Sequence, residues 1–194
     1  MQRWKLSREL RLRTAVKDHL AAVQERGDIP LRYLVKSTPS SMHSMWELSR
    51  WLDHEPFVLT TVDTIFREQE FATYVRDFQT LLEQGRGDGL MGITDYIDDE
   101  KPLYVATDDS LRITGFLDSC DNPRYISGGI YGLTPGSIAT LNRCIERGES
   151  RMRNFQRALV SDGLRLQAWP FSKVLDIDHA SDIQKAEAFL KIED

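Results

Sequence analysis

The stretch VLTTVDTIF, at residues 58–66, places an acidic side chain directly after an apolar run. Residues 57–61 are apolar and β-branched without alternation, which is typical of a strand that is covered on both faces. The run continues into Val62-Asp63-Thr64. Because open α/β sheets bind ligands beyond the carboxyl ends of their strands, Asp63 is positioned to hold a hard cation that bridges phosphate oxygens. The alternative is that Asp63 merely caps the next turn.

A second acidic stretch, VLDIDHASDIQKAEAFL, occupies residues 174–190. Asp176 and Asp178 lie two positions apart on an extended segment, so their side chains are expected on the same face. Proteins usually hold Mg²⁺ with one or two carboxylates, while substrate phosphates and water complete the coordination. The pair Asp63 and Asp176 suits that role, so the two stretches together predict a Mg²⁺ site.

The rest of the chain predicts one α/β domain over residues 1–194, with a basic helical segment at 1–30 and a core at 31–194. Strands are expected at about 31–36, 57–61, 89–95, 103–107, 111–118, 125–133, 164–169 and 173–177. Helices are expected at about 5–26, 41–52, 68–82, 135–147, 151–162 and 181–191. This order of elements indicates a mixed sheet flanked by helices.

The composition is that of an ordinary soluble globular chain, with 41% hydrophobic and 28% charged residues. No apolar run approaches the roughly 20 residues that cross a bilayer, and the N-terminus lacks the apolar stretch of a signal peptide. A cytoplasmic protein without a membrane partner is therefore expected. The two cysteines, Cys120 and Cys144, form no CxxC pair, so we expect reduced thiols rather than zinc ligands.

The net charge of −5 is unevenly distributed along the chain. Residues 1–36 carry nine Lys or Arg against four Asp or Glu. A basic segment of this kind is either an arm that binds nucleic acid or the solvated face of a helix. Its apolar residues, such as Leu12, Val16 and Leu20, are spaced along one helix face, and the rest of the chain is acidic. Both observations favour the solvated helix, and a nucleic-acid partner is not expected.

The two acidic stretches, in this order, resemble the metal-binding loops of sugar-1-phosphate nucleotidyltransferases and of molybdenum-cofactor-type nucleotidyltransferases. The resemblance covers residues 31–191 and implies the nucleotide-diphospho-sugar-transferase-like fold, with a mixed, mainly parallel sheet flanked by helices. In that family, an aspartate of the first loop and an acidic residue of a closing DxDxxxDLxxAExxL segment hold Mg²⁺. The matching residues here are Asp63 and Asp176. Asp178 is a further metal candidate, and Asp182 matches the aspartate that caps the last helix.

The segment KSTPSSMHS, at residues 36–44, lies where the family has a small-residue loop against the nucleotide base and ribose. The resemblance therefore offers Ser41 and Ser44 as nucleotide contacts. The alternative is an ordinary serine-rich turn that caps the following helix.

Two later segments are implied to face the sugar and the phosphates. ISGGIYGLTP, at residues 126–135, looks like the family's glycine-bearing strand beside the sugar. Gly128 and Gly129 either allow a ligand to approach the backbone closely or mark a bulge. Arg151 and Arg153, in the helical segment SRMRNFQRALV, are offered as phosphate partners, with a solvated helix face as the alternative.

One part of the family pattern has no counterpart in these residues. The family opens with a strand and a glycine-rich loop, AAGxGxRL, whose backbone amides cradle the triphosphate. Nothing in residues 1–36 matches that loop, and Gly27 is the first glycine of the chain. The fold is therefore expected to be N-terminally incomplete, with weak or no transfer activity. Either its open sheet edge favours aggregation or a homo-oligomer, or the sheet has closed up and the N-terminal helix covers the gap.

The resemblance implies a nucleotidyltransferase that uses Mg²⁺ to transfer a nucleotidyl group from a nucleoside triphosphate to a sugar phosphate or similar phosphate acceptor. The alternative, favoured by the unmatched glycine-rich loop, is a catalytically impaired relative. Such a relative would bind a nucleotide or nucleotide-sugar and have a regulatory or assembly role. The expected partners of the enzyme are a nucleoside triphosphate and a phosphorylated small molecule.

Overall fold

The structure, a computed structural model, describes residues 15–27, 30–52, 54–97, 101–177 and 179–191. The chain divides into two compact units, at residues 1–38 and 39–194. In the first unit, residues 15–26 form a helix that ends at Gly27, whose φ of 71° favours a glycine. The predicted first helix is confirmed over its described part, while residues 5–14 lie outside the described residues.

Residues 31–36, which the sequence predicts as a strand, belong to no strand in the structure. The side chains of Leu34 and Val35 are exposed, at 36% and 63%. The prediction is wrong because strand propensity is realised only where side chains pack against neighbours on a sheet, and this segment has no such covered face.

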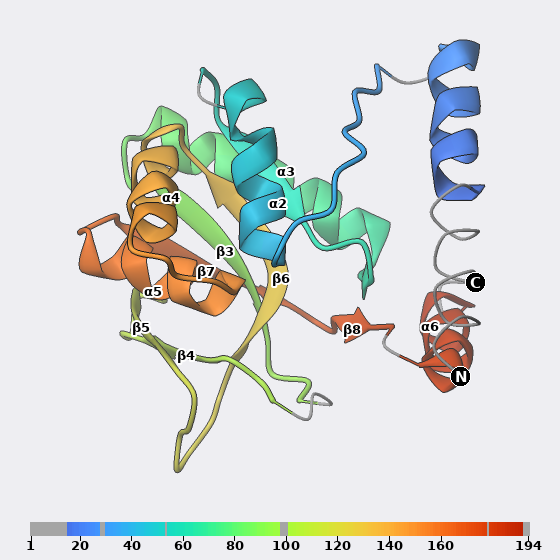
Figure 1. The fold of residues 1–194 in the computed structure, drawn as a ribbon. Helices are drawn as coiled ribbons and strands as arrows, with labels where there is room; N and C mark the ends of the chain where they lie inside the picture. Colours follow the sequence, from blue (N-terminus) through green and yellow to red (C-terminus); the bar gives the residue numbers. More distant parts are fainter. Residues whose placement is uncertain (1–14, 28–29, 53, 98–100, 178, 192–194) are drawn as a thin grey trace, which may run out of the picture. The chain divides into compact units, whose positions relative to one another are not determined.

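The second unit is built on a six-stranded sheet, of which β3 and β6 lie side by side at the centre of Figure 1. The strands are β1 (Phe57–Thr60), β3 (Gly89–Thr94), β4 (Tyr104–Thr107), β5 (Ile113–Leu117), β6 (Ile126–Leu133) and β7 (Leu166–Phe171). Their order is β5-β4-β6-β3-β7, and β1 also pairs with β6.

The predicted mixed character of the sheet is confirmed. The β3–β7 ladder is parallel, whereas β6 is antiparallel to β1, β3 and β4, and β5 is antiparallel to β4. Strands β1, β3, β4 and β7 therefore run in one direction. The ladders are nevertheless mostly antiparallel, because β6 runs the opposite way in the middle of the sheet.

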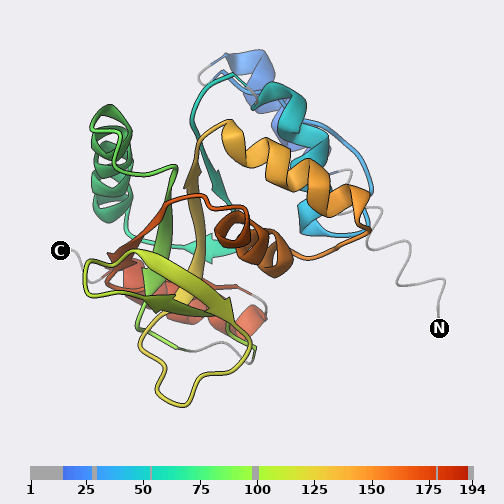
Figure 2. The same cartoon turned by 90° about the vertical axis from the view of Figure 1, so that its left-hand side faces the viewer.

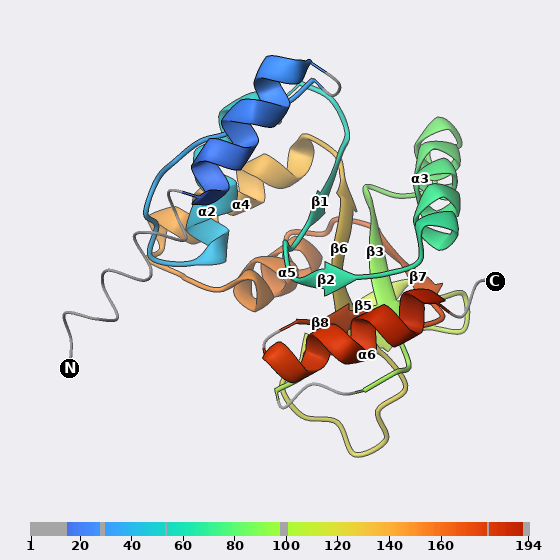
Figure 3. The same cartoon turned by 90° about the vertical axis from the view of Figure 1, so that its right-hand side faces the viewer.

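Helices cover both faces of the sheet, as Figure 3 shows. One face is covered by α2 (Ser41–Leu48), α4 (Gly136–Glu146) and α5 (Met152–Ser161), and the other by α3 (Glu68–Glu83). Tyr74 of α3 is fully buried, and its hydroxyl donates to the Leu90 carbonyl of β3 at 2.6 Å. The predicted helices of this unit are thus confirmed, and the short 3₁₀ turn Ser49–Trp51 extends α2.

The β4–β5 hairpin, which faces the viewer in Figure 2, turns at Asp108-Asp109-Ser110, between two strands that the sequence predicts. The Leu111 amide donates to the Asp108 carbonyl at 3.0 Å. Asp108 Oδ1 also accepts from the amides of Ser110 and Arg112, each at 2.9 Å. The aspartate side chain therefore holds its own turn, which is typical of this residue in loops.

A second, two-stranded sheet pairs β2 (Thr64–Ile65) with β8 (Leu175–Asp176) in antiparallel fashion. Helix α6 (Ala180–Leu190) packs on this pair through Phe189. The Asp182 carboxylate accepts from the His179 amide at 2.9 Å, which confirms its predicted capping role. The predicted strand at 173–177 is present as β8, whereas β2 was not predicted.

The two cysteines are free, as expected: Cys144 is buried and Cys120 is exposed. Burial raises the pKa of the Cys144 thiol. Among the described residues, none of the helices has the length and apolar character that a membrane span requires.

Candidate functional site

The β2–β8 pair brings the two acidic stretches of the sequence together beside α6 (Figure 3). Thr64 and Asp176 are direct partners in this ladder. The Ile177 amide donates to the Asp63 carbonyl at 3.0 Å, which extends the pairing by one position. We call the paired segments, residues 61–64 and 175–177, the acidic loops. Their position beyond the end of β1 is the one that the sequence predicts for a ligand site.

Two threonine hydroxyl groups form hydrogen bonds within the acidic loops. The buried Thr64 hydroxyl donates to Asp176 Oδ1 at 3.1 Å, and it is also hydrogen-bonded to the Thr61 hydroxyl. The side chains of Asp63 and Asp176 themselves are exposed. A buried hydroxyl therefore fixes one carboxylate oxygen, while both carboxylates remain accessible from solvent.

A bulge in β6 contacts the acidic loops. Met91 of β3 is opposite Tyr131, but Ile93 is opposite Ser127, so β6 holds two additional residues between these pairs. Gly129 lies within this bulge and has a φ of 71°. Its carbonyl accepts from the Thr61 amide at 3.3 Å, which brings the bulge into contact with the first acidic loop.

The two glycines of the bulge have different surroundings. A Cβ at Gly129 would lie 2.9 Å from the Thr64 Oγ1 atom and 3.0 Å from the Thr61 Oγ1 atom. A Cβ at Gly128 would instead lie 3.2 Å from the Val174 Cγ2 atom, within the core. The bulge proposed for these glycines is therefore confirmed. Of the two glycines, Gly129 is the one that borders the acidic loops.

A buried polar network lies next to the acidic loops. Ser127 Oγ donates to Gln156 Oε1 at 2.9 Å, and Gln156 Nε2 donates to the Tyr131 hydroxyl at 3.5 Å. Burial, followed by the negative charges of Asp176 and Asp63, raises the pKa of Tyr131 to about 12, although a hydrogen bond with Ser127 acts in the opposite direction.

These supporting residues were not predicted from the sequence. Thr61 and Thr64 lie close to Asp63 in the first acidic stretch, and Tyr131 lies in the glycine-bearing segment. Their positions in these segments could therefore have identified them as candidate site residues. The sequence around Gln156 did not indicate a role for it, because a glutamine within an amphipathic helix is normally exposed.

The oxygen donors of the acidic loops suit a hard divalent cation. They are two carboxylates and two threonine hydroxyls, and Mg²⁺ prefers oxygen ligands that leave positions for phosphate and water. Asp178, the third predicted ligand, lies outside the described residues. Within the described part of the chain, no group of three or more histidine, cysteine or acidic side chains is placed to hold a metal.

The predicted nucleotide contacts Ser41 and Ser44 lie in the first turns of α2 and are exposed. Ser40 caps this helix by accepting from the His43 amide, and Ser44 Oγ donates to the Ser40 carbonyl. The arrangement matches the alternative of a serine-rich turn that caps a helix. Helix α2 packs against α4, where Trp46 Nε1 donates to an asparagine side chain at 3.1 Å.

Arg151 and Arg153, the predicted phosphate partners, line a cavity of about 700 Å³ at the start of α5. Arg153 Nη1 lies 2.7 Å from Asp118 Oδ1 in an ion pair. The cavity also includes Lys101 and Arg157. We call these four basic residues, arranged around Asp118, the basic pocket.

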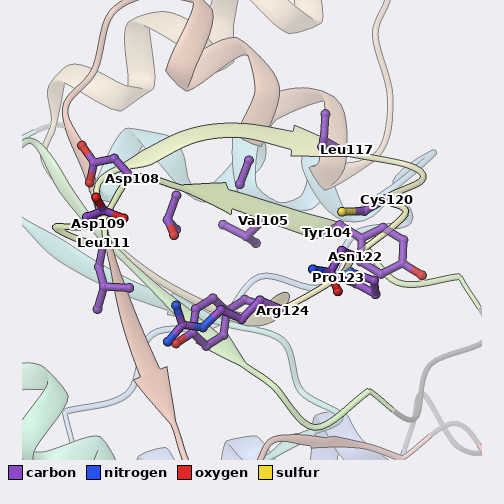
Figure 4. Close-up of a pocket in the computed structure, with 13 residues that line it drawn as sticks. Tyr104, Val105, Asp108, Asp109, Leu111, Leu117, Cys120, Asn122, Pro123 and Arg124 are labelled. Atoms are coloured by element: carbon purple, nitrogen blue, oxygen red, sulfur yellow. The ribbon is translucent and has the colours of Figure 1, made fainter.

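A separate cavity of about 530 Å³ lies at the β4–β5 hairpin (Figure 4). Figure 4 shows Asp108 and Asp109 at one end of this cavity and Cys120 at the other. The Arg124 guanidinium lies 4.9 Å from the centre of the Tyr125 ring. Of the predicted site residues that the structure describes, none lines this cavity. The Asp108 carboxylate is already engaged in the hairpin turn.

Comparison with solved structures identifies the fold. A proposed glucose-1-phosphate thymidylyltransferase of Bacillus anthracis, determined with sucrose, matches with a TM-score of 0.75 at 17% identity, over 93% of this chain and 73% of that chain. The inositol-1-phosphate CTP transferase of T. maritima matches with a TM-score of 0.62 at 17% identity, over 79% and 63% of the two chains. A CMP-2-keto-3-deoxy-manno-octonic acid synthetase complexed with CTP matches with a TM-score of 0.60 at 13% identity, over 81% and 70%.

The chain therefore has the nucleotide-diphospho-sugar-transferase-like fold, and the resemblance inferred from its acidic stretches is confirmed at the level of the fold. No protein-family model matches the sequence, and the search of curated proteins gives no match.

Proposed function

We propose that this protein binds a nucleoside triphosphate and a divalent cation at the acidic loops, and transfers the nucleotidyl group to a sugar phosphate or similar phosphate acceptor. The observation that carries the proposal is the β2–β8 ladder, which joins Asp63 to Asp176 beyond the end of β1. The fold neighbours, which are named for reactions or complexes with nucleotides and sugar phosphates, support it.

In the proposed reaction, a phosphate oxygen of the acceptor attacks the α-phosphorus of the triphosphate, and the bond to pyrophosphate breaks. A bound Mg²⁺ supplies charge neutralisation for the phosphates. Asp63 and Asp176 would hold the cation, and Thr64 orients Asp176 through the hydrogen bond of 3.1 Å. Tyr131 stays protonated at neutral pH because its pKa is about 12, so its hydroxyl can donate a hydrogen bond.

The alternative function is binding of a nucleotide or nucleotide-sugar without transfer. It is supported by residues 1–36, which contain no match to the glycine-rich loop that cradles the triphosphate in the resembled family. Loss of a single preorganised donor costs about 10²–10³ in rate in well-studied enzymes, so transfer depends strongly on a complete phosphate cradle.

The metal and nucleotide part of the proposal is tested by calorimetric titration of the full chain with Mg²⁺ and a panel of nucleoside triphosphates. Asp63→Asn and Asp176→Asn should each weaken cation-dependent nucleotide binding by at least about tenfold, because each removes a charged ligand. Asp121→Asn, at an exposed loop position, is the matched control and should bind as the wild type does. Unchanged binding in both site variants would exclude the acidic loops as the cation site.

Transfer is tested separately, by measuring pyrophosphate released from each nucleoside triphosphate in the presence of hexose 1-phosphates. Release that needs the acceptor and disappears in Asp63→Asn supports the transferase. Tight, cation-dependent binding without release supports the alternative.

A further inference from the structure

The basic pocket concentrates positive charge on a chain that is acidic as a whole. Four basic side chains and one carboxylate line a cavity of about 700 Å³, whereas the chain has a net charge of −5. The residues come from three separate segments: Lys101 before β4, Asp118 after β5, and the three arginines in α5 or directly before it. Such convergence of like charge on a concave surface raises the local concentration of anions.

Two of the arginines are held in fixed positions. Asp118 Oδ1 receives Arg153 Nη1 and Arg157 Nη2, each at 2.7 Å. Arg153 Nη2 also donates to the Lys101 carbonyl at 3.1 Å, and Arg157 Nε donates to the Phe116 carbonyl at 3.1 Å. The side chains of both arginines are only about a third exposed, at 29% and 31%. Their guanidinium groups therefore line the cavity in a preorganised arrangement.

Arg151 completes the charge at the mouth of the pocket. Its exposed guanidinium makes no hydrogen bond or ion pair with any residue in the described part of the chain. The same residue precedes the first turn of α5, which contains no acidic residue and has no side-chain cap. Asn154 and Ser150 add neutral polar groups to the lining. Asp118, the one carboxylate among the described lining residues, is shared between two arginines, so these residues together carry an excess of positive charge.

From this geometry we infer that the basic pocket is a binding site for a phosphate-class oxyanion, and that it works without the divalent cation of the acidic loops. Arginine guanidinium groups are well suited to phosphate oxygens because their planar N–H donors bind two oxygens at once. A dianion matches the surplus charge better than a monocarboxylate does.

The polar network links the basic pocket to the acidic loops. Gln156 lies one helical turn after Arg153 on α5, and it contacts Ser127 and Tyr131. The Ser127 amide in turn donates to the Leu103 carbonyl at 2.9 Å, close to Lys101 in the chain. The network therefore connects the helix that carries Arg153 and Arg157 to the strand that contains the bulge beside the acidic loops.

The inference is tested by titrating the full chain with inorganic phosphate in a buffer free of divalent cations, followed by calorimetry or phosphorus NMR. Arg151→Ala should weaken phosphate binding at least about fivefold, because it removes a charge-assisted donor. Asp118→Asn should have the opposite effect and tighten binding several-fold, because it removes the only carboxylate among the described residues that line the pocket. Arg76→Ala, an exposed arginine on α3, is the matched control and should change nothing.

Two further measurements separate this inference from the proposed function. Asp63→Asn should leave phosphate binding unchanged, since the pocket does not depend on the cation, and acetate should bind more weakly than phosphate. The inference is overturned if Arg151→Ala binds phosphate like the wild type, if Asp63→Asn abolishes phosphate binding, or if acetate binds equally well. Thermal melts of the variants establish that each is folded, and the opposite signs expected for Arg151→Ala and Asp118→Asn exclude a common folding defect.

Discussion

The acidic loops and the basic pocket are assembled in different ways. Backbone pairing positions the acidic loops: β2 faces β8, and the Ile177 amide binds the Asp63 carbonyl at 3.0 Å. Side chains position the basic pocket, where Asp118 Oδ1 receives two guanidinium groups at 2.7 Å each. Partly exposed ion pairs of this kind contribute little to stability. Substitutions under the acidic loops should therefore affect folding and binding together, whereas substitutions in the basic pocket should affect binding alone.

The largest effect is expected for Gly129→Ala. Its Cβ would lie 2.9 Å from Thr64 Oγ1, and the residue would keep a φ of 71° that disfavours alanine. We expect a loss of about 1–3 kcal/mol in the free energy of unfolding. Cation-dependent nucleotide binding should also fall at least about tenfold, because Thr64 and Asp176 must shift. Denaturant unfolding and calorimetric titration measure the two effects.

The matched control for this substitution is Gly163→Ala. Gly163 has a φ of 82°, but nothing lies within 4 Å of the position that its Cβ would take. It should lose about 1 kcal/mol of stability from the backbone alone and bind ligands normally. If both variants bind equally well, the bulge does not set the geometry of the acidic loops.

A smaller effect is expected for Thr64→Val, which keeps the shape of the side chain and removes its hydroxyl. Asp176 then loses the donor that lies 3.1 Å from its Oδ1 atom. Loss of a group that orients a metal ligand typically weakens metal affinity by about 10–100-fold, and we expect the lower end because Asp176 is exposed. Thr80→Val, on the exposed face of α3, removes a hydroxyl of the same kind and should leave affinity unchanged.

The smallest effect concerns the ionisation of Tyr131, which senses the acidic loops. Its pKa is about 12 because of burial and then the charges of Asp176 and Asp63. Asp176→Asn should lower this pKa, while Arg151→Ala should not. The pKa is measured from the ultraviolet absorbance of tyrosinate, and the Tyr131→Phe variant identifies which part of the absorbance comes from Tyr131. An equal shift in Asp121→Asn would show that the carboxylates do not lie near the phenol.

The same raised pKa predicts a dependence of stability on pH. The folded state favours the neutral phenol, so this contribution to stability is complete below the unfolded pKa of about 10 and is lost as pH rises through about 12. Tyr131→Phe should therefore lose stability less steeply over that range. A slope remains, because burial raises the pKa of Tyr74 as well.

Most elements of the second unit could be predicted because their signals are local. Strand β3, for example, reads GLMGIT and is buried along its whole length, so its continuous apolar run was sufficient. Strand β2 was not predicted because two residues are too few to show a hydrophobic periodicity, and because its partner β8 lies near the other end of the chain. Residues 31–36 carried the composition of a strand but lack the packing that would make them one.

The candidate site was predicted only in part, for a related reason. Asp63 and Asp176 each follow or occupy a strand, so their chemistry and position were visible in the sequence. The contribution of Gln156 depends on the burial of one face of α5 against β6, which no local pattern encodes. The basic pocket likewise draws on Lys101 and Asp118, which come together with Arg153 only after the β4–β5 hairpin and α5 have packed.

The pairing of β2 with β8 also sets the order in which the site is completed during synthesis. Thr64 and Asp176 are 112 positions apart, so a growing chain presents the first acidic loop long before its partner exists. Closing so long a loop costs conformational entropy, and the two-residue ladder that closes it is short. The segment formed by β8 and α6 is thus a candidate for early local unfolding. A ligand that bridges Asp63 and Asp176 would keep this segment attached, and would thereby protect the C-terminal end of the chain from proteases.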